Sequence, residues 1–375
     1  MTTQSPQSPA IPTDRLALIK PIALVVLLAV ALAVPSAAPV LFPGTAIMAI
    51  AVFTVLYAAC ASAWNIFSGY TGYIALGHAV FFGSGAYALA IMCKGWHVHS
   101  DYGPLLLLPL CGVIAAIIAI PVGIISLRTR GHTFVVITIA TFFIFQLLAY
   151  NLRFITQGSA GLELPIPSWS GAAFDPPFYY TGLLILLLAV GASWWVRRSK
   201  YGLGLLAIKD DEDRARGLGV RTGPSKLLAF TLSAFFVGML GGLWAYYIES
   251  VFPNSGFDAL FDVAIALMVF LGGLGTLAGP ILGALILIPA QQYVASDRTL
   301  TSWYLILYGA LFLVVILLLP EGILPTVRKR LIQWRGRRPA TGAAPGATPG
   351  AFPGGPPRSG PPGRVAPVSS DGGER

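Results

Sequence analysis

The sequence contains few charged residues and few motifs of known catalytic sites. Charged residues make up 10% of the 375 residues, and only 15 are Asp or Glu. A phosphate-binding loop needs a Lys between Gly and Ser or Thr, and no Lys here follows a Gly. No GxSxG or HExxH motif occurs, and no two acids are placed for acid–base chemistry. We therefore expect a protein that is not an enzyme and does not hydrolyse ATP itself.

Cysteine is also scarce. Cys60, Cys93 and Cys111 lie in or at the edge of apolar stretches, without CxxC spacing. Such residues usually act as small packing groups rather than as metal ligands or disulfide partners. We expect no metal and no cofactor.

Long apolar runs dominate what remains, as in residues 21–34 and 304–319, and apolar residues make up 56% of the chain. Runs of this length are typical of an all-α polytopic membrane protein. A membrane crossing takes about 20 helical residues. About ten transmembrane helices are predicted, near residues 16–34, 45–66, 73–93, 104–127, 132–150, 178–196, 225–248, 262–273, 277–295 and 303–319.

Basic residues predict the orientation. With ten crossings, Lys94, Arg153 and Arg298 fall in one set of loops, and all other Lys and Arg lie on the opposite side. The positive-inside rule then places both termini in the cytoplasm, as for a multi-pass protein of a bacterial inner membrane. The net charge of +9 is attributed to topology and anionic membrane lipid, not to nucleic acid.

The ends of the chain differ in composition from its centre. Residues 1–14 and 326–375 are rich in small and polar residues or Pro and Gly, after a basic start in the second case, so both are predicted to be disordered tails. The transmembrane domain is expected to span residues 15–325, with a long inner loop at 197–224. Residues 36–38 would also suit a signal-peptide cleavage site, but a retained first helix is the favoured interpretation.

Ionisable groups are almost absent from the predicted membrane interior. All acids fall in loops, tails or span ends, with Glu249 and Asp262 expected at the outer boundary. Ion-coupled pumps usually need acids at depth, so the driving force is expected to come from another subunit. His78 lies well inside a predicted span and is either a hydrogen-bonded helix contact or a proton relay.

Two glycine-rich stretches lie at predicted inner turns: SGYTGYIALGHAVFFGSGAY (68–87) and FLGGLGTLAGPILGA (270–284). Their glycines would allow either an unwound transport helix or close helix packing, and both alternatives are open. Candidate residues of a translocation path are Gly69, Gly72, Gly77, His78, Gly83, Gly85, Tyr87, Thr133, Gly272, Gly273, Gly275 and Thr276.

The inner loop contains a candidate docking helix. A short helix is predicted to begin within Asp210–Asp213 and to end near Arg214 and Arg216, a charge placement that suits its dipole. Such a helix would dock on another protein, or would be only a solvated connector. The candidate coupling residues are Ala207, Ile208, Asp210, Asp211, Glu212, Gly217 and Gly219.

These stretches, together with RGHTFVVITIA (130–140) and AIKDDEDRARGLGV (207–220), resemble the M-type (LivM-type) permease subunits of branched-chain amino acid ABC transporters. The resemblance covers about residues 62–325. It implies a second, H-type permease, two ATP-binding subunits, an extracytoplasmic solute-binding protein, and a coupling helix at residues 207–220. Tyr73 and Ala75 stand where the family suggests Gln and Ser.

The function that follows from the resemblance is ATP-driven import of branched-chain amino acids by alternating access. A urea or short-amide permease of the same family is the nearest alternative. A secondary transporter working alone is disfavoured because acids are missing from the predicted spans. A membrane scaffold without transport activity is disfavoured because several transport motifs occur in order.

Overall fold

The computed structural model describes residues 47–98, 101–296, 309–310 and 322–326. The predicted spans at 16–34 and, except for residues 309–310, at 303–319 lie outside the described residues. So do both predicted tails, 1–14 and 326–375, except for Thr326.

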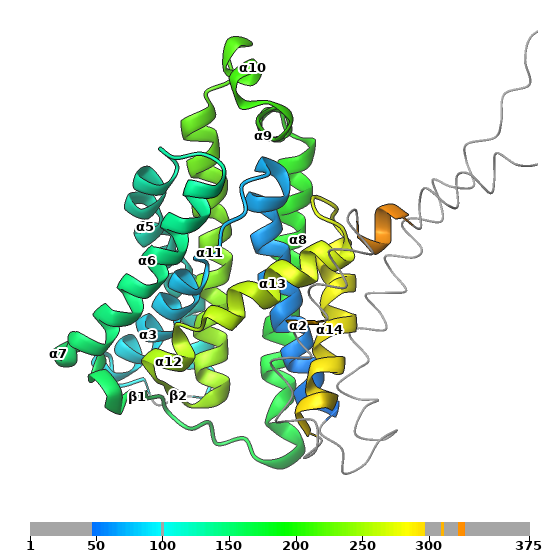
Figure 1. Ribbon diagram of the computed structural model, residues 1–375. Helices are drawn as coiled ribbons and strands as arrows, with labels where there is room; N and C mark the ends of the chain where they lie inside the picture. The colour runs from blue at the N-terminus through cyan, green and yellow to red at the C-terminus, as the bar shows by residue number, and fades with distance from the viewer. Residues whose placement is uncertain (1–46, 99–100, 297–308, 311–321, 327–375) are drawn as a thin grey trace, which may run out of the picture. The chain divides into compact units, whose positions relative to one another are not determined.

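The described residues form an all-α polytopic membrane protein. Six helical segments are long and apolar enough to cross a membrane: Ile47–Gly69, Leu108–Ser126, His132–Asn151, Asp175–Arg198, Thr222–Ile248 and Pro253–Gly272. Two shorter apolar helices, α3 (Ala79–Gly95) and α14 (Gly279–Ser296), accompany them. Figure 1 shows α9 and α10 at one end of the bundle and the small strands at the other.

The first described helices follow the predicted spans, with one exception. α2 (Ile47–Trp64) continues into a π-helical turn, η1 (Asn65–Gly69). α3 was predicted to begin at residue 73 but begins at Ala79, because residues 73–77 are irregular in spite of their apolar character. α4 (Gly103–Leu106) is a separate turn before α5 (Leu108–Ser126), and α6 (His132–Asn151) follows.

The long connection after α6 is largely structured. It contains α7 (Arg153–Thr156), η2 (Gly158–Ala160), β1 (Leu162–Glu163) and η3 (Gly171–Ala173). β1 pairs antiparallel with β2 (Ser250–Val251), matching Leu162 with Val251. This small sheet joins two connections at the end of the bundle away from α9 and α10 (Figure 1).

Three of the six long helical segments follow this connection. α8 (Asp175–Arg198) has an acid in its first turn and arginines in its last, as the helix dipole favours. α9 (Lys200–Asp210) and α10 (Glu212–Gly217) then lead to α11 (Thr222–Ile248). α12 (Pro253–Gly256) precedes α13 (Ala259–Gly272), which the glycine-rich turn separates from α14, as predicted.

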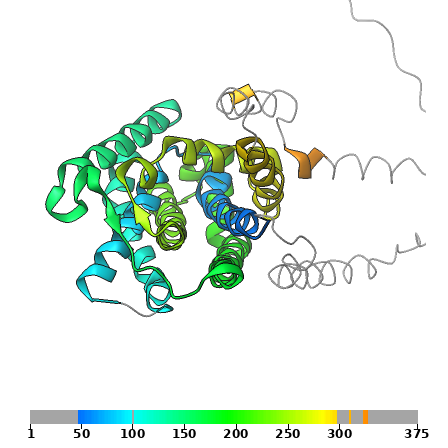
Figure 2. The same cartoon turned by 90° about the horizontal axis from the view of Figure 1, so that it is seen from below.

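α11 is the central helix of the described bundle and packs most extensively on α5 and α3, while α2 packs on α8 and α14. In the view along the bundle, the blue α2 lies beside the yellow α14 and the green α8 (Figure 2). Glycines permit the closest contacts: a Cβ on Gly85 would lie 2.0 Å from the carbonyl oxygen of Gly238, and one on Gly241 2.0 Å from that of Phe82. Close packing of this kind replaces the hydrophobic effect, which does not drive helices together in lipid.

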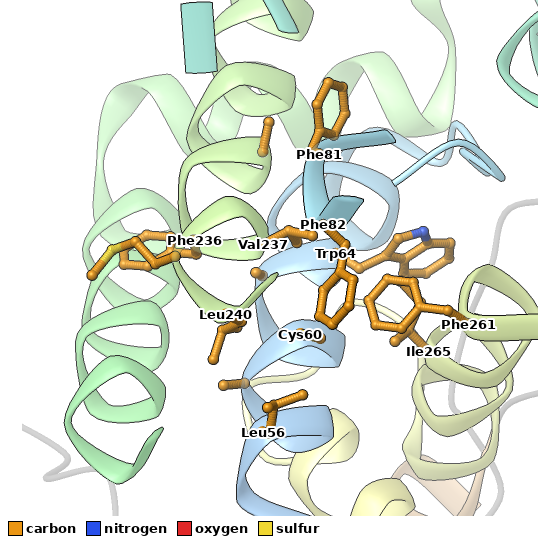
Figure 3. Close-up of a cluster of buried hydrophobic side chains, with 14 of the residues drawn as sticks. Leu56, Cys60, Trp64, Phe81, Phe82, Phe236, Val237, Leu240, Phe261 and Ile265 are labelled. Carbon is orange, nitrogen blue, oxygen red and sulfur yellow. The ribbon is translucent and has the colours of Figure 1, made fainter. Parts of the chain in front are cut away.

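Aromatic side chains fill the space between α2, α3, α11 and α13. Figure 3 shows Trp64, Phe82 and Phe261 next to one another at the C-terminal end of α2. The rings of Phe82 and Phe261 lie 4.3 Å apart. This cluster fixes α13 against the helices on either side of the irregular stretch 73–77.

Candidate functional site

The glycine stretch 68–87 interrupts the helix and also packs it, so both interpretations of the sequence have a structural counterpart. Gly72 has φ +75°, a left-handed conformation that glycine adopts without strain, and the chain then runs irregularly to His78. Gly77 lies against α6, where a Cβ would be 2.6 Å from the Thr138 carbonyl oxygen. Gly83 and Gly85 lie within α3 and allow it to contact residues 256–257 and α11.

Neighbouring side chains form hydrogen bonds with the backbone N–H and C=O groups of the irregular stretch. The Trp64 indole donates to the Ala75 carbonyl oxygen at 2.8 Å, and the N–H of Ala75 donates to the Ser68 hydroxyl at 3.3 Å. The N–H of Leu76 donates to the Thr138 hydroxyl at 3.2 Å. Non-helical backbone inside a membrane protein is tolerated only with such partners. The stretch is therefore an ordered interruption between α2 and α3, stabilised by hydrogen bonds. We call it the α2–α3 break (residues 70–78).

The second glycine-rich turn lies directly against the first. Asn65, 1% exposed, accepts from the N–H of Gly275 and donates to the Thr276 carbonyl oxygen, both at 2.9 Å. Gly273 and Gly275 have φ of +124° and +79°, which explains why glycine occurs there. Thr276 accepts from the N–H of Gly279 at 3.0 Å and so starts α14. Gly272 is buried beside Gly279.

The interior of the bundle contains an acid that the sequence analysis placed at the outer boundary. Asp262 is 3% exposed and accepts from the N–H of Ala79 at 3.1 Å, at the first residue of α3. Its other carboxylate oxygen is buried without a hydrogen-bond partner among the described residues. Asp262 lies in the first turn of α13, and its burial against α3 was not predicted because its hydrogen-bond partner is on another helix.

His78 precedes α3 and is fully buried. Its Nε2 lies 2.9 Å from the Ser233 hydroxyl of α11, and its ring packs on Phe81 and Phe230. No partner for Nδ1 occurs among the described residues. This arrangement favours a hydrogen-bonded helix contact, since a relay would need a partner on both ring nitrogens.

Two further path candidates lie apart from the break. Tyr87 is 5% exposed and stacks on Phe257 with ring centroids 5.8 Å apart. It lines an apolar cavity of about 310 Å³ between α3, α5 and α6, towards the strand end of the bundle. Thr133 is exposed in the first turn of α6. The structure thus groups the glycines of 69–77 and 272–276 and leaves Tyr87 and Thr133 outside that group.

The predicted coupling helix is two helices rather than one. Asp211 is extended, and its carboxylate accepts from the N–H groups of Asp213 and Arg214 at 3.0 Å, so it ends α9 and caps α10. Ala207, Ile208 and Asp210 therefore belong to α9, and the coupling helix implied at 207–220 is divided in two. The short helix predicted to begin within 210–213 is α10: Glu212 begins it, Gly217 ends it, and Gly219, with φ +87°, follows it.

The apolar stripe of this segment is buried for the most part. Leu205, Ile208 and Ala215 are 0%, 3% and 1% exposed, whereas Leu218 is 84% exposed. The segment thus packs on its own bundle through one face. Leu218 and the charged residues remain accessible on the other face.

Glu212, the first residue of α10, is at the centre of a polar cluster. Its side chain is 8% exposed and lies 2.8 Å from Lys226 of α11, 3.6 Å from Arg216 and 3.8 Å from Arg130, which precedes α6. The Tyr73 hydroxyl donates to its other oxygen. Arg130 also contacts Asp213 at 2.9 Å.

The pKa values at this cluster follow from its contacts. Burial raises the pKa of Glu212, but the hydrogen bonds from Lys226 and Tyr73 and the charges of Lys226 and Arg130 outweigh it, and the pKa lies below its ordinary value. Burial and the neighbouring carboxylate raise the pKa of Tyr73. Glu212 is thus held as an acceptor and Tyr73 as a donor.

A second cation connects the same segment to both glycine turns. Lys209 of α9 donates to the Gly69 carbonyl oxygen at 3.0 Å, and its Nζ lies 3.3 Å from where a Cβ on Gly275 would be. Burial lowers its pKa. A cavity of about 390 Å³ lies between this segment, the α2–α3 break and the start of α6.

Sequence reasoning missed most of these connecting residues: Asn65, Arg130, Lys209, Lys226 and the interior role of Asp262. Lys226 and Asp262 lie in or beside apolar runs, and a charged residue in such a place is a sequence signal of a buried polar contact. Their partners are far away in sequence, so no local pattern could identify them. Within the described residues, no group of three His, Cys, Asp or Glu side chains could hold a metal ion.

A glycine-broken helix inside an apolar bundle, linked to a polar segment at one end, is typical of membrane transport proteins. Residues 46–316 match the family described as "Branched-chain amino acid transport system / permease component". The chain belongs to this family.

Individual relatives agree with the family. The chain is 28% identical to the high-affinity branched-chain amino acid permease LivM of Salmonella typhimurium and of Escherichia coli, over 75% of this chain and 71% of each relative. It is 25% identical to the inner membrane ABC transporter permease YjfF of Escherichia coli, over 60% of this chain and 70% of that one. No solved structure matches the chain. The relatives and the apolar helices make this a multi-pass protein of a bacterial inner membrane.

Proposed function

We propose that this chain is one permease of an ATP-driven importer for branched-chain amino acids. The relatives named for that transport support the solute class. The observation that carries the mechanism is the contact between α10 and the α2–α3 break, made by Glu212 and Tyr73. ATP binding elsewhere can move a pore only through such a contact, because this chain has no nucleotide motif of its own.

The partners follow from the family. An H-type permease completes the pore, two ATP-binding subunits act on residues 207–220, and an extracytoplasmic binding protein delivers the solute. Leu218, at 84% exposed, and the exposed charges of α10 support docking of this segment in a groove of an ATP-binding subunit. The glycines of the break and of the second turn, together with His78, contribute to the path that opens and closes.

The full topology proposed for the chain has ten crossings and both termini in the cytoplasm. The six long helices and the two shorter ones of the described residues support eight of these crossings. The remaining two are the apolar runs near 16–34 and 303–319, and the tails 1–14 and 326–375 carry no transport function. A chain truncated after Pro339 should therefore insert and transport almost as the full chain does.

The test of the function is uptake by the complete complex in proteoliposomes, with leucine, urea and a short amide compared under the same conditions. Leucine uptake that depends on ATP and on the binding protein supports the proposal. Uptake of urea alone would assign the chain to the urea or short-amide branch of the family. Uptake without ATP-binding subunits would instead indicate a secondary transporter.

The docking of residues 207–220 has its own test. Gly219 has open space around it, but its φ of +87° makes any side chain strained, and Ala207 packs partly on the bundle, so Leu218→Glu is the cleaner change. We expect Leu218→Glu to abolish crosslinking between this segment and the ATP-binding subunit while the permease still inserts. Gly223→Ala, at a position with no atom within 4 Å of the new Cβ, is the control and should crosslink normally.

A further inference from the structure

Glu212 is an unusually buried acid in an otherwise exposed segment. Its side chain is 8% exposed, whereas Asp213 beside it is 74% exposed and Arg214 85%. A carboxylate withdrawn from water in this way is costly unless it is fully paired. The pairing groups come from three other parts of the chain: Lys226 of α11, Tyr73 of the α2–α3 break, and Arg130 before α6.

Tyr73 and Lys226 also bind each other. Lys226 Nζ donates to the Tyr73 hydroxyl at 3.2 Å and lies 4.5 Å from the centre of its ring. Lys226 is 3% exposed on its side chain and therefore cannot replace these partners with water. The three residues form a closed cluster, so Glu212 cannot move away from the bundle without pulling Tyr73 or leaving a buried charge unpaired.

The position of Tyr73 determines where such a pull would act. It lies at the start of the irregular stretch, and α3 begins six residues later at Ala79. Ala75 and Leu76, between the two, are bonded to Trp64 of α2 and Thr138 of α6. These hydrogen bonds restrict the conformations of the connection between Tyr73 and Ala79. A displacement of Tyr73 therefore moves the N-terminus of α3, because the connection is not a flexible loop that could absorb it.

We propose that Tyr73 is a positioning residue that transmits movement of α10 to α3 through Glu212. The proposal rests on the function proposed above, in which α10 receives the motion of an ATP-binding subunit. It adds the group through which that motion reaches α3 within this chain, namely the hydroxyl group of Tyr73. Docking and transmission are separable, because Tyr73 lies outside the exposed face of α10 on which a partner would dock.

The deciding variant is Tyr73→Phe, which removes only the hydroxyl. The complex should assemble, the crosslink from α10 to the ATP-binding subunit should persist, and ATP turnover should continue. Leucine taken up per ATP hydrolysed should fall about tenfold, as expected for loss of a hydrogen bond to a charged group. Tyr73→Gln should restore most of the coupling, because its amide can donate to Glu212.

The matched control is Tyr201→Phe. It removes a hydroxyl of α9 that donates to the Ser225 carbonyl oxygen of α11, without touching the α2–α3 break. We expect uptake per ATP close to that of the unmodified complex. Coupling lost equally in Tyr201→Phe and Tyr73→Phe would overturn the proposal, as would normal coupling in Tyr73→Phe.

Hydrogen exchange separates failure of this link from failure of the proposed function. In the intact complex, amides 73–82 should change their exchange on ATP binding, and Tyr73→Phe should abolish that change while Tyr201→Phe retains it. This measurement needs no transported solute. A complex that carries no leucine but shows this exchange pattern contradicts the solute assignment alone. An ATP response at 73–82 that survives in Tyr73→Phe contradicts the link.

Discussion

The Asn65 side chain bonds the backbone of Thr276 across 211 positions of sequence, donating to its carbonyl oxygen at 2.9 Å. The same amide accepts from the N–H of Gly275 at 2.9 Å. The end of α2 and the turn between α13 and α14 are therefore held as one unit. Both glycine-rich stretches of the sequence meet at this point.

Replacing Asn65 by Leu should destabilise the protein. The change roughly keeps the size of the side chain but removes the partner of the Gly275 N–H and of the Thr276 C=O, both in half-buried residues, at a cost of up to about 1–3 kcal/mol each. Thermal unfolding in detergent should show a lower Tm. Asn151→Leu is the control, since Asn151 is exposed and bonds only within its own helix. An equal Tm for both variants would mean that the Asn65 bonds contribute no stability.

Gly85→Ala should lower the stability of the protein by disrupting the packing of α3 on α11. The new Cβ would lie 2.0 Å from the Gly238 carbonyl oxygen, so α3 and α11 must move apart, at about 1–3 kcal/mol or more. Gly191→Ala in α8 meets no atom within 4 Å and should be neutral or stabilising by about 0.5–1 kcal/mol. Measuring both by unfolding in the same detergent gives the comparison. A Gly85→Ala protein as stable as Gly191→Ala would show that α3 and α11 are not closely packed.

Asp262→Leu should weaken the start of α3, whereas Asp262→Asn should not. Asn retains an oxygen that accepts from the N–H of Ala79, and Leu does not, a difference of about 1–2 kcal/mol for a helix cap. Faster hydrogen exchange at residues 79–82 in the Leu variant would report the lost cap. Equal exchange in the Leu and Asn variants would show that Ala79 has another acceptor.

The stability contributed by Glu212 should depend on pH. Its folded pKa is lowered, so the unfolded chain binds more protons, and stability rises with pH between the folded pKa and the unfolded value of about 4.3. The contribution is fully present above that value and is lost as pH falls through the folded pKa. The groups that face Glu212 are Lys226, Arg130, Arg216 and Tyr73, with Asp213 beyond Arg130. Unfolding of the unmodified protein and of Glu212→Gln from pH 3 to 6 should differ in slope; identical slopes would show that Glu212 does not titrate differently on folding.

Labelling of single cysteines should establish the topology. An impermeant reagent should reach positions near Lys94 and within 151–177 from outside, because these two loops contain only one basic residue each, Lys94 and Arg153, whereas most Lys and Arg lie on the other side. Positions in 197–224 should react only after the membrane is opened. Labelling of 197–224 in intact cells would invert the proposed orientation.

The elements of this protein that could be predicted from sequence are those set by local properties. Long apolar runs place the residues around 45–66, 132–150 and 225–248 in helices that cross the membrane, because such runs are unfavourable in water over their whole length. The glycines of 69–77 and 272–276 are also a local signal, because glycine by itself permits a break in a helix as well as close helix packing. The acids at 210–213 and the bases at 214 and 216 predict the short helix α10, which begins at Glu212 as expected.

Only the tertiary structure shows what each interruption is for. Residues 73–77 are apolar enough to continue a membrane-spanning helix. They are irregular because Trp64, Ser68 and Thr138 form hydrogen bonds with their backbone groups. Likewise Asp262 is inside the bundle because α3 begins beside it, and Tyr73 meets Glu212 across 139 positions of sequence. Apolarity and glycine content act on each segment by itself. These hydrogen bonds depend on the register of one helix against another, which exists only after the helices have packed.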